Sequence, residues 1–309
     1  MEQRMERATI RGIATPVSRL IIGADNQVDI ESTAIFDDWF DVGGNAFDTG
    51  WWYFDGECQR MLGQWITRNG VRDEVVVIDK VAHTPACTPA AVTEQLHESL
   101  ERLGHDHIDL LLLHRDNLEV PVAEFVDVLA EHQRAGLIGA YGASNWTTAR
   151  IDVANGYAAS AGAAPFVALS NNLALARMVD VPWPGCETMD DDDRRWAADH
   201  QMAILPWSSQ GRGFFTERAA PEKVTNAELV STWYSNSNFE RKARAAKLAA
   251  ERGVEEINIA LAWVLAQPYP TFPLIGPRNS AELASSLVAL SVDLTSDELA
   301  WLDLRTDTA

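Results

Sequence analysis

EVVVIDKVA, residues 74–82, and HIDLLLLHR, residues 107–115, are two apolar runs of strand length separated by a helix-length amphipathic segment, 88–104. In that segment Thr88 is a suitable N-cap, and Pro89 suits the first helical position. The two runs do not alternate polar and apolar residues, which is typical of strands covered on both faces. The stretch therefore predicts two parallel strands joined by a right-handed helical crossover.

The same alternation continues along the chain. Further strands are expected at 19–25, 45–50, 137–145, 165–172, 201–209 and 271–277. Further helices are expected at 30–44, 58–70, 121–136, 147–161, 190–200, 239–253, 256–267 and 280–290. Eight strands alternating with helices predict an α/β fold, a closed (β/α)8 TIM barrel. An open doubly wound sheet is the alternative, but no G-x-G-x-x-G motif follows the first strand.

The length and composition fit a single barrel domain. The chain has 309 residues, of which 47% are hydrophobic and 23% are charged, so we expect one domain spanning 1–309. The connection 212–239 has little periodicity and follows the seventh strand, and long connections of this kind are usually functional. We expect this connection to lie over the C-terminal rim of the barrel, with the segment 181–189 bordering the same pocket.

The charge balance excludes several classes of partner. The chain carries 25 Lys and Arg against 45 Asp and Glu, a formal net charge of −20, which repels nucleic acid and anionic membranes. We expect a small-molecule substrate instead. Three cysteines without metal-type spacing predict reduced thiols, no metal site and a cytoplasmic location. The N-terminus lacks the apolar core of a signal peptide, and the longest aliphatic run is too short to span a bilayer.

Polar and ionisable residues stand at the carboxyl ends of the expected strands, where barrel enzymes place their catalytic groups. Asp48 follows the second strand, Lys80 lies in the third and His114 ends the fourth. The segment FDTGWWYFDG, 47–56, adds Tyr53 and a cluster of aromatic residues. Each of these residues has an ordinary alternative as a turn aspartate, a solvated lysine or a core histidine. Together on one rim they form a coherent set for proton transfer.

These segments resemble the motifs of the aldo-keto reductase family. FDTGWWY is similar to its D-T-A-x-x-Y signature, VIDKV to its lysine-bearing strand, LLLLHRD to its histidine-bearing strand and IGAYGASNW to its G-V-S-N-F segment. ALAWVLAQP and FPLIGPRNSAEL resemble its C-terminal helix and cofactor loop. The resemblance covers about residues 15–303. It implies a (β/α)8 barrel that binds NADP(H), or less often NAD(H), without a Rossmann fold.

The resemblance also implies that Asp48, Tyr53, Lys80 and His114 are the catalytic residues of an oxidoreductase that interconverts a carbonyl (aldehyde, ketone or sugar) and the alcohol. A free tyrosine, with a pKa of about 10, is a weak acid near neutrality. The Lys80 ammonium, held by Asp48, would lower the pKa of Tyr53 by favouring the phenolate. His114 would orient the carbonyl oxygen by a hydrogen bond.

A cofactor bed follows from the same resemblance. Ser144 and Asn145 match residues that bind the nicotinamide carboxamide, and Ser170 or Asn171 must replace the usual glutamine of the sixth strand. Trp207 matches the aromatic residue that stacks on the nicotinamide, with core packing as its alternative. The loops toward the pyrophosphate and the adenosine contribute Ser208, Gly211, Gly276, Arg278, Glu282 and Ser286.

The adenosine end favours NADP(H) over NAD(H). Arg278 stands where a cation would meet the 2′-phosphate in a charge-assisted contact. Glu282 occupies a position that is often Arg or Gln, and Ser286 one that is often Asn. Glu282 and Ser286 both weaken the expected preference for NADP(H). NADP(H) therefore remains the first expectation, and NAD(H) stays open.

Flat aromatic faces at the mouth suit sugars or aromatic aldehydes. The candidates for substrate contact are Trp51, Trp52, Trp146 and Arg115. Either tryptophan of the 51–52 pair could instead pack under the rim, and Arg115 with Arg177 and Arg212 could make a local anion site. Two other functions stay open: a sugar or alcohol dehydrogenase working oxidatively with NAD, and a nicotinamide-binding regulatory subunit with little turnover. The oligomeric state is unknown.

Overall fold

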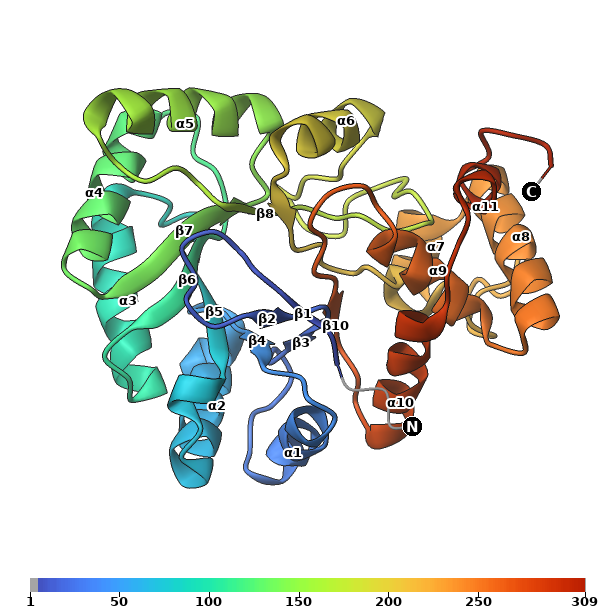
Figure 1. Ribbon diagram of the computed structural model, residues 1–309, viewed down its shortest axis with the longest axis horizontal. Coiled ribbons are helices and arrows are strands. Elements are labelled where there is room, and N and C mark those ends of the chain that lie inside the picture. Colours follow the sequence, from blue (N-terminus) through green and yellow to red (C-terminus); the bar gives the residue numbers. More distant parts are fainter. Residues whose placement is uncertain (1–4, 309) are drawn as a thin grey trace.

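The computed structural model describes residues 5–308, and its centre is an eight-stranded parallel sheet curled into a barrel (Figure 1). Residues 1–4 and 309, which the predicted domain includes, lie outside the described residues. The strand order around the sheet is β10-β3-β4-β5-β6-β7-β8-β9. The strands are β3 (Ile21–Gly23), β4 (Ala46–Asp48), β5 (Val76–Val81), β6 (Ile108–Leu113), β7 (Ile138–Ser144), β8 (Ala168–Ser170), β9 (Ala203–Ile204) and β10 (Leu274–Ile275).

The two edges of the sheet meet and close the barrel. The Ile204 backbone N–H of β9 donates to the Pro270 carbonyl at 2.8 Å, and the Phe272 N–H donates back to the Ile204 carbonyl at 2.8 Å. One step further along, the Leu274 N–H donates to the Pro206 carbonyl at 3.0 Å. The predicted (β/α)8 barrel is therefore confirmed, and no strand edge of the ring is left unpaired between β9 and β10.

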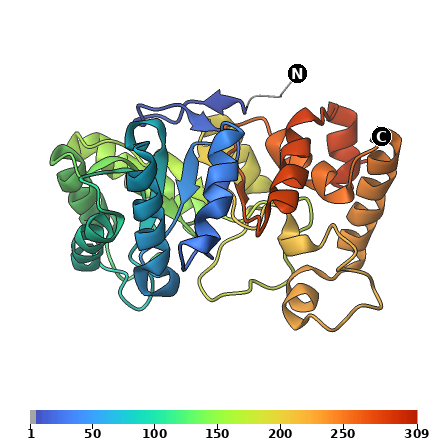
Figure 2. The same ribbon diagram turned by 90° about the horizontal axis from the view of Figure 1, so that it is seen from below.

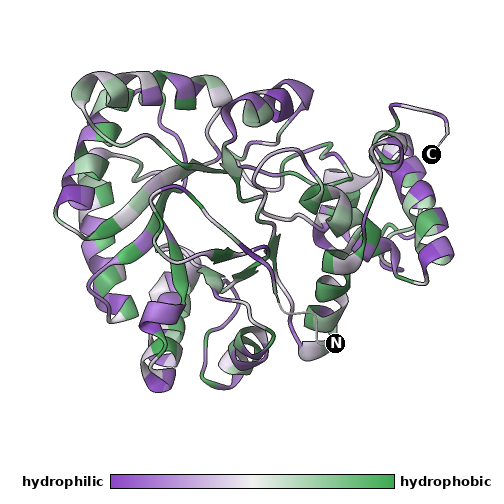
Figure 3. Cartoon of the chain, in the orientation of Figure 1, coloured by the Kyte–Doolittle hydropathy of each residue, from purple (hydrophilic) through white to green (hydrophobic). Residues whose placement is uncertain are grey.

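Helices cover the outside of the barrel, with mainly hydrophobic strands inside and mixed hydropathy along the helices (Figure 3). They are α1 (Ala34–Asp41), α2 (Glu57–Asn69), α3 (Pro89–Leu103), α4 (Val122–Arg134), α5 (Thr148–Ala161), α6 (Asp191–His200), α7 (Ala227–Trp233), α8 (Asn236–Arg252), α9 (Glu256–Leu265), α10 (Ser280–Val288) and α11 (Ser296–Leu302). Thr88 caps α3 by accepting from the Ala91 N–H, and the left-handed Gly104 ends it, as the sequence predicts.

Three elements were not predicted. An antiparallel hairpin, β1 (Arg7–Ala8) and β2 (Val17–Ser18), crosses one end of the barrel, opposite the long connections that follow β9 (Figure 2). Its apolar side chains join the inner core. α7 lies inside the 212–239 connection, and α11 follows the last predicted helix. The two helices have seven residues each, too few to give a clear period in the sequence, and the hairpin strands lie outside the apolar runs that reveal the barrel strands.

Within residues 5–308, no helix combines the length and the apolar character that crossing a membrane requires.

Candidate active site

The polar rim arises from the two-residue period of the strands. The inner core of the barrel contains Ala46, Ile78, Leu112 and Ala168, whose side chains point inward from strands β4, β5, β6 and β8. Two residues further along the same strands, the inward positions are polar, because successive strand side chains alternate between faces. These positions are Asp48, Lys80, His114 and Ser170. The apolar barrel interior thus ends in one polar layer at the carboxyl ends of the strands.

Asp48 and Lys80 form a buried ion pair in this layer. The Lys80 Nζ lies 2.5 Å from Asp48 Oδ2, and the two side chains are 3% and 4% exposed. Lys80 Nζ also donates to the Thr49 carbonyl at 3.0 Å. Its ammonium lies 5.2 Å from the centre of the Tyr53 ring, so the predicted partners are brought together.

Burial and charge shift the pKa values of these groups in opposing ways. Burial lowers the pKa of Lys80, but Asp48 and Tyr53 outweigh it and the net pKa is raised. Burial raises the pKa of Asp48 to about 6, against the opposing effect of Lys80. Burial also raises the pKa of Tyr53 to about 12, and Lys80 only partly opposes it. The expected lowering of the Tyr53 pKa by Lys80 is present, but burial is the larger effect.

His114 stands against Tyr53 at the end of β6. The two rings lie 5.5 Å apart at 90°, and the His114 backbone N–H donates to the Val81 carbonyl at 2.7 Å. Burial lowers the pKa of His114 well below its usual value, and the charge of Lys80 adds to this. His114 is therefore a neutral imidazole at neutral pH, able to donate a hydrogen bond without carrying a charge.

His83 extends this aromatic group and was missed by the sequence analysis. Its ring lies 4.7 Å from the His114 ring at 86°, and it stacks on Trp52 at 4.7 Å and 13°. His83 Nδ1 donates to the Thr84 carbonyl at 2.7 Å, which leaves Nε2 as the acceptor nitrogen of the neutral ring. The left-handed Ala82 before it breaks the strand alternation, so the period could not have found it.

The four predicted substrate residues separate into different surroundings. Trp52 is 50% exposed and stands at the rim over His83. Trp51 instead turns outward, where its indole N–H donates to Glu98 Oε2 at 2.6 Å. Trp146 is fully buried against Phe166, so the prediction that it contacts substrate is wrong: a side chain without exposed surface has no face to offer.

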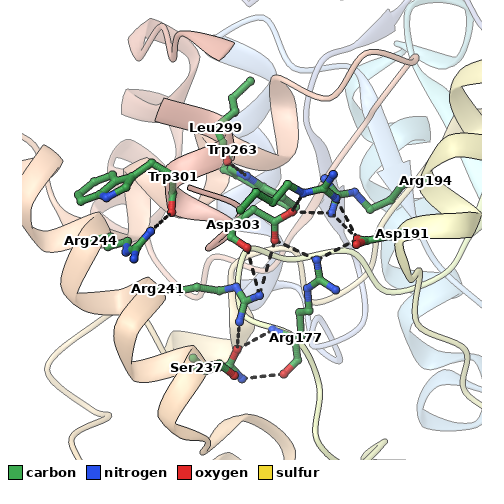
Figure 4. A network of polar contacts seen from close by, with 12 residues as sticks. Arg177, Asp191, Arg194, Ser237, Arg241, Arg244, Trp263, Leu299, Trp301 and Asp303 are labelled. Carbon is green, nitrogen blue, oxygen red and sulfur yellow. Dashed lines mark hydrogen bonds and ion pairs between the residues drawn. The ribbon is translucent and has the colours of Figure 1, made fainter. Parts of the chain in front are cut away.

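Arg115 is also buried, at 5% exposure, and it holds the rim together. Its Nη1 donates to the His114 carbonyl at 2.9 Å, and its Nε donates to the Pro184 carbonyl at 3.4 Å. Arg177 pairs with Asp303 at 3.0 Å in a network beside α11 (Figure 4). The guanidinium groups of Arg115 and Arg177 thus bind protein groups, and a local anion site formed by Arg115, Arg177 and Arg212 stays a prediction.

The nicotinamide-side residues form a hydrogen-bonded layer of their own. Ser144 Oγ donates to the Ser170 carbonyl at 2.9 Å and accepts from Asn145 Nδ2 at 2.9 Å. Asn145 Nδ2 also donates to the His114 carbonyl at 3.3 Å, so both of its amide hydrogens are used within the protein. Asn171 Nδ2 donates to the Trp146 carbonyl at 2.8 Å. The structure thus places all four predicted residues on one arc of the rim.

Trp207 lies after β9 and faces a second aromatic residue that the sequence analysis did not single out. Its ring lies 5.9 Å from Trp183, which belongs to the predicted bordering segment 181–189. Arg212 packs over Trp183 at 5.2 Å and pairs with Glu228 of α7 at 2.5 Å. The connections after β8 and β9 therefore meet above the rim.

The predicted adenosine-side residues lie in the turn after β10 and on α10. Gly276 is exposed, and a Cβ added there would meet open space. Arg278 Nη2 lies 2.9 Å from Glu282 Oε1, so the cation expected to meet a 2′-phosphate is paired with a carboxylate one helical turn away. Ser286 accepts from Gln210 Nε2 at 3.3 Å, which ties α10 to the loop carrying Ser208 and Gly211.

A sequence model of the aldo/keto reductase family matches residues 20–304, nearly the whole chain. The chain belongs to the aldo-keto reductase family. It is therefore an NAD(P)H-dependent type of oxidoreductase, as the motifs at the rim predict.

Two sequence relatives of this aldo-keto reductase are named as an oxidoreductase and a dehydrogenase, and a solved structure shares its fold. It is 27% identical to an uncharacterized oxidoreductase, YrpG, of Bacillus subtilis, over 93% of this chain and 91% of the relative. It is 26% identical to an aryl-alcohol dehydrogenase [NADP(+)] of Phanerodontia chrysosporium, over 88% of this chain and 75% of the relative. A solved glycerol dehydrogenase from Gluconobacter oxydans shares the fold with a TM-score of 0.78 and 23% identity, covering 96% and 94% of the two chains.

The rim of this aldo-keto reductase fits a nicotinamide at one end better than a 2′-phosphate at the other. Asn171 Oδ1 and Trp207 Nε1 are buried polar atoms without a hydrogen-bond partner within residues 5–308. A free acceptor beside Ser170 suits the amide hydrogens of a nicotinamide, and unpaired buried atoms of this kind often mark a ligand position. The Arg278 guanidinium, in contrast, is already paired with the Glu282 carboxylate and has to leave it to bind a 2′-phosphate at full strength. Elsewhere in residues 5–308, no three His, Cys, Asp or Glu side chains are grouped to hold a metal ion.

Proposed function

We propose that this aldo-keto reductase interconverts an aromatic aldehyde or ketone and the corresponding alcohol, with Tyr53 as general acid. The observation that carries the proposal is the buried ammonium of Lys80, paired with Asp48 at 2.5 Å and set against the ring of Tyr53, with His114 beside that ring. Buried ionisable groups with shifted pKa values cluster at functional sites, and a buried ion pair set against a phenol supports a role in proton transfer.

The residues divide the chemistry among themselves. A nicotinamide bound beside Asn171 and Trp207 would supply the hydride for reduction of the carbonyl carbon, or take it from the alcohol carbon in the reverse reaction. Tyr53, whose pKa burial raises to about 12, is protonated at neutral pH and gives its proton to the carbonyl oxygen. Lys80 then stabilises the phenolate that remains. His114, neutral because its pKa is lowered, donates a hydrogen bond to the same oxygen and orients it.

Trp52 and His83 support an aromatic substrate. Trp52 presents a half-exposed ring stacked on His83, and His83 in turn meets His114 at the reacting end. A ring seated on this wall would lie edge or face to several aromatic groups, an arrangement that stabilises aromatic pairs. The name of the Phanerodontia chrysosporium relative, an aryl-alcohol dehydrogenase, agrees with this substrate class.

The cofactor is proposed to be NADP(H), with NAD(H) as the alternative. Arg278 stands where the resemblance expects a partner of the 2′-phosphate, and the same relative is named as an NADP(+) enzyme. Glu282 weakens this preference, because its carboxylate occupies Arg278 and would repel a phosphate at that place. The attraction of Arg278 and the repulsion of Glu282 for a 2′-phosphate together decide the preference for NADP(H) over NAD(H).

The proposal is tested by following the consumption of NADPH and NADH with benzaldehyde, an aromatic ketone and a sugar aldehyde. We expect turnover with benzaldehyde that exceeds turnover with the sugar. Faster oxidation of a polyol with NAD would favour the dehydrogenase alternative. Tight cofactor binding without turnover of any of these compounds would favour the regulatory subunit.

Three broader proposals accompany this one. Residues 1–309 act as a single barrel domain, in keeping with the family match over 20–304. The enzyme works in the cytoplasm, because Cys58, Cys87 and Cys186 are free and buried thiols rather than disulfides. Its substrate is a small molecule, since the net charge of −20 disfavours nucleic acid.

A further inference from the structure

The segment that carries Tyr53 has a backbone that needs support. Directly after Tyr53, the φ angles of Phe54, Asp55 and Gly56 are 47°, 52° and 83°. Two consecutive non-glycine residues in the left-handed region are uncommon, and such a conformation persists only where neighbouring groups hold it. From the barrel side the segment is held by the Trp51 N–H, which donates to the Lys80 carbonyl at 2.8 Å.

Outside the barrel, Arg102 and Glu98 of α3 hold the residue two places before Tyr53. Arg102 Nη1 donates to the Trp51 carbonyl at 3.0 Å, and its guanidinium lies 5.2 Å from the centre of the Trp51 ring. Glu98 Oε2 accepts from the Trp51 indole N–H at 2.6 Å and from Arg102 Nη2 at 3.1 Å. Trp51, Arg102 and Glu98 therefore form a closed ring of contacts.

Arg102 also covers the residue that ends the left-handed stretch. A Cβ added at Gly56 would lie 2.6 Å from Cδ, Nε and Cζ of Arg102, so the arginine packs directly on this glycine. Only glycine fits both this contact and the φ of 83°. One side chain of α3 thus touches the chain on both sides of Tyr53.

Arg102 is itself fixed by a polar chain that leads back to β5. Gln59 Oε1 accepts from Arg102 Nη1 at 3.2 Å, while Gln59 Nε2 donates to Asp79 Oδ1 at 2.9 Å and to Ser99 Oγ at 2.8 Å. Asp79 precedes Lys80 and points to the opposite face of the strand. The same strand therefore reaches the Tyr53 segment from inside through Lys80 and from outside through Asp79, Gln59 and Arg102.

We propose that Arg102, with Glu98, is a positioning residue for Tyr53, setting the distance of the phenol from Lys80 by fixing residues 51–56 from outside the barrel. The inference rests on the proposed role of Tyr53 as the general acid. It assigns a mechanistic role to residues that touch neither substrate nor cofactor, and it explains why the sequence places a tryptophan at position 51.

The test compares Arg102→Ala with Arg68→Gln as a matched control, because Arg68 on α2 lies on the same outer surface and pairs loosely with Asp37 at 3.8 Å. For Arg102→Ala we expect kcat for benzaldehyde to fall about tenfold or more, because small displacements of a catalytic group are costly. The Kd for NADPH should stay unchanged. Arg68→Gln should match the wild type in both measurements.

A second measurement separates positioning from plain stability. The chain has five tyrosines, so the ultraviolet titration of Tyr53 is obtained by subtracting the titration of Tyr53→Phe. In Arg102→Ala the pKa of Tyr53 should move, because its distance to Lys80 changes. A folded variant with wild-type kcat and an unmoved Tyr53 titration would overturn the proposal, even if its Tm were lower.

Glu98 provides variants that keep the test decisive if Arg102→Ala does not fold. Glu98→Gln keeps an oxygen acceptor for the Trp51 indole and should retain most of kcat, whereas Glu98→Ala should lower kcat as Arg102→Ala does. If kcat were equal in Glu98→Ala and the wild type, the proposed role of Arg102 and Glu98 in positioning Tyr53 would be refuted. Full activity of Tyr53→Phe would instead refute the proposed function, so the two failures are distinguishable.

Discussion

At the scale of single residues, two adjacent tryptophans have opposite environments. The chain turns at the end of β4, so Trp51 points outward to Glu98 and Arg102 while Trp52 stays at the rim over His83. An indole needs an apolar surface for its ring and a partner for its N–H. Trp51 meets the second need through Glu98, whereas Trp52 stacks its ring on His83 and is half exposed to water. The sequence predicted that at least one of them would reach the mouth, and Trp52 does.

Trp52→Ala should therefore raise KM for an aromatic aldehyde and leave KM for a small aliphatic aldehyde nearly unchanged. An aromatic pair contributes about 0.5–1.5 kcal/mol beyond buried area, or about two- to tenfold in KM, shared by ground and transition states. Steady-state kinetics with both aldehydes measure this. Phe54→Ala is the control, since Phe54 is exposed and adjacent. An equal rise in KM for both aldehydes would show that Trp52 is no aromatic platform.

The pairing of Arg278 with Glu282 makes a second prediction at this scale. Glu282→Gln should free Arg278 for a 2′-phosphate and strengthen NADPH binding over NADH binding. Arg278 is 66% exposed, so solvent screening keeps the gain at about 1 kcal/mol, roughly fivefold in Kd. Binding titrations with both cofactors check this against Glu131→Gln on the distant helix α4. If Kd changed equally for NADPH and NADH, Arg278 would not discriminate between them.

At the scale of elements, Asp303 joins α11 to α6 and α8 (Figure 4). Its carboxylate, 2% exposed, lies 2.9 Å from Arg194, 3.0 Å from Arg177 and 3.7 Å from Arg241. Burial alone would raise the pKa of Asp303, but the hydrogen bond and charge of Arg194 and the other arginines lower it below the usual value. The stability that it contributes is thus present above the unfolded pKa of about 3.9 and is lost as pH falls through the lower folded pKa.

Asp303→Asn should lower the free energy of unfolding at neutral pH by about 3 kcal/mol, because it leaves buried arginine charge uncompensated. The difference from the wild type should shrink as the pH falls from about 4, the unfolded pKa, through the lower pKa at which the folded carboxylate becomes protonated. Urea unfolding across this pH range measures both effects, with the exposed Asp297→Asn of the same helix as control. A destabilisation that did not depend on pH would mean that the charge of Asp303 is not what stabilises this junction.

At the scale of the whole molecule, the barrel and its polar rim could be predicted because one regular period generates both. Lys80, Asp48 and His114 continue inward-facing rows of apolar residues, and their spacing along each strand is visible in the sequence. The β1–β2 hairpin could not be predicted, because its strands Arg7–Ala8 and Val17–Ser18 lie outside the apolar runs that reveal the barrel strands. His83 was missed because a left-handed residue precedes it, and the burial of Trp146 because its packing partner Phe166 is distant in sequence.

The most direct measurement of the central claim is single-turnover oxidation of NADPH with benzaldehyde by the wild type and by Tyr53→Phe. With the Tyr53 pKa raised to about 12, the phenol keeps its proton, so the wild-type rate should be flat from about pH 6 to 9. Tyr53→Phe should bind NADPH as tightly as the wild type and react about 100-fold more slowly or worse, because phenylalanine has no hydroxyl proton to give to the carbonyl oxygen. A near-wild-type rate in Tyr53→Phe, with NADPH bound, would contradict the assignment of Tyr53 as the proton donor.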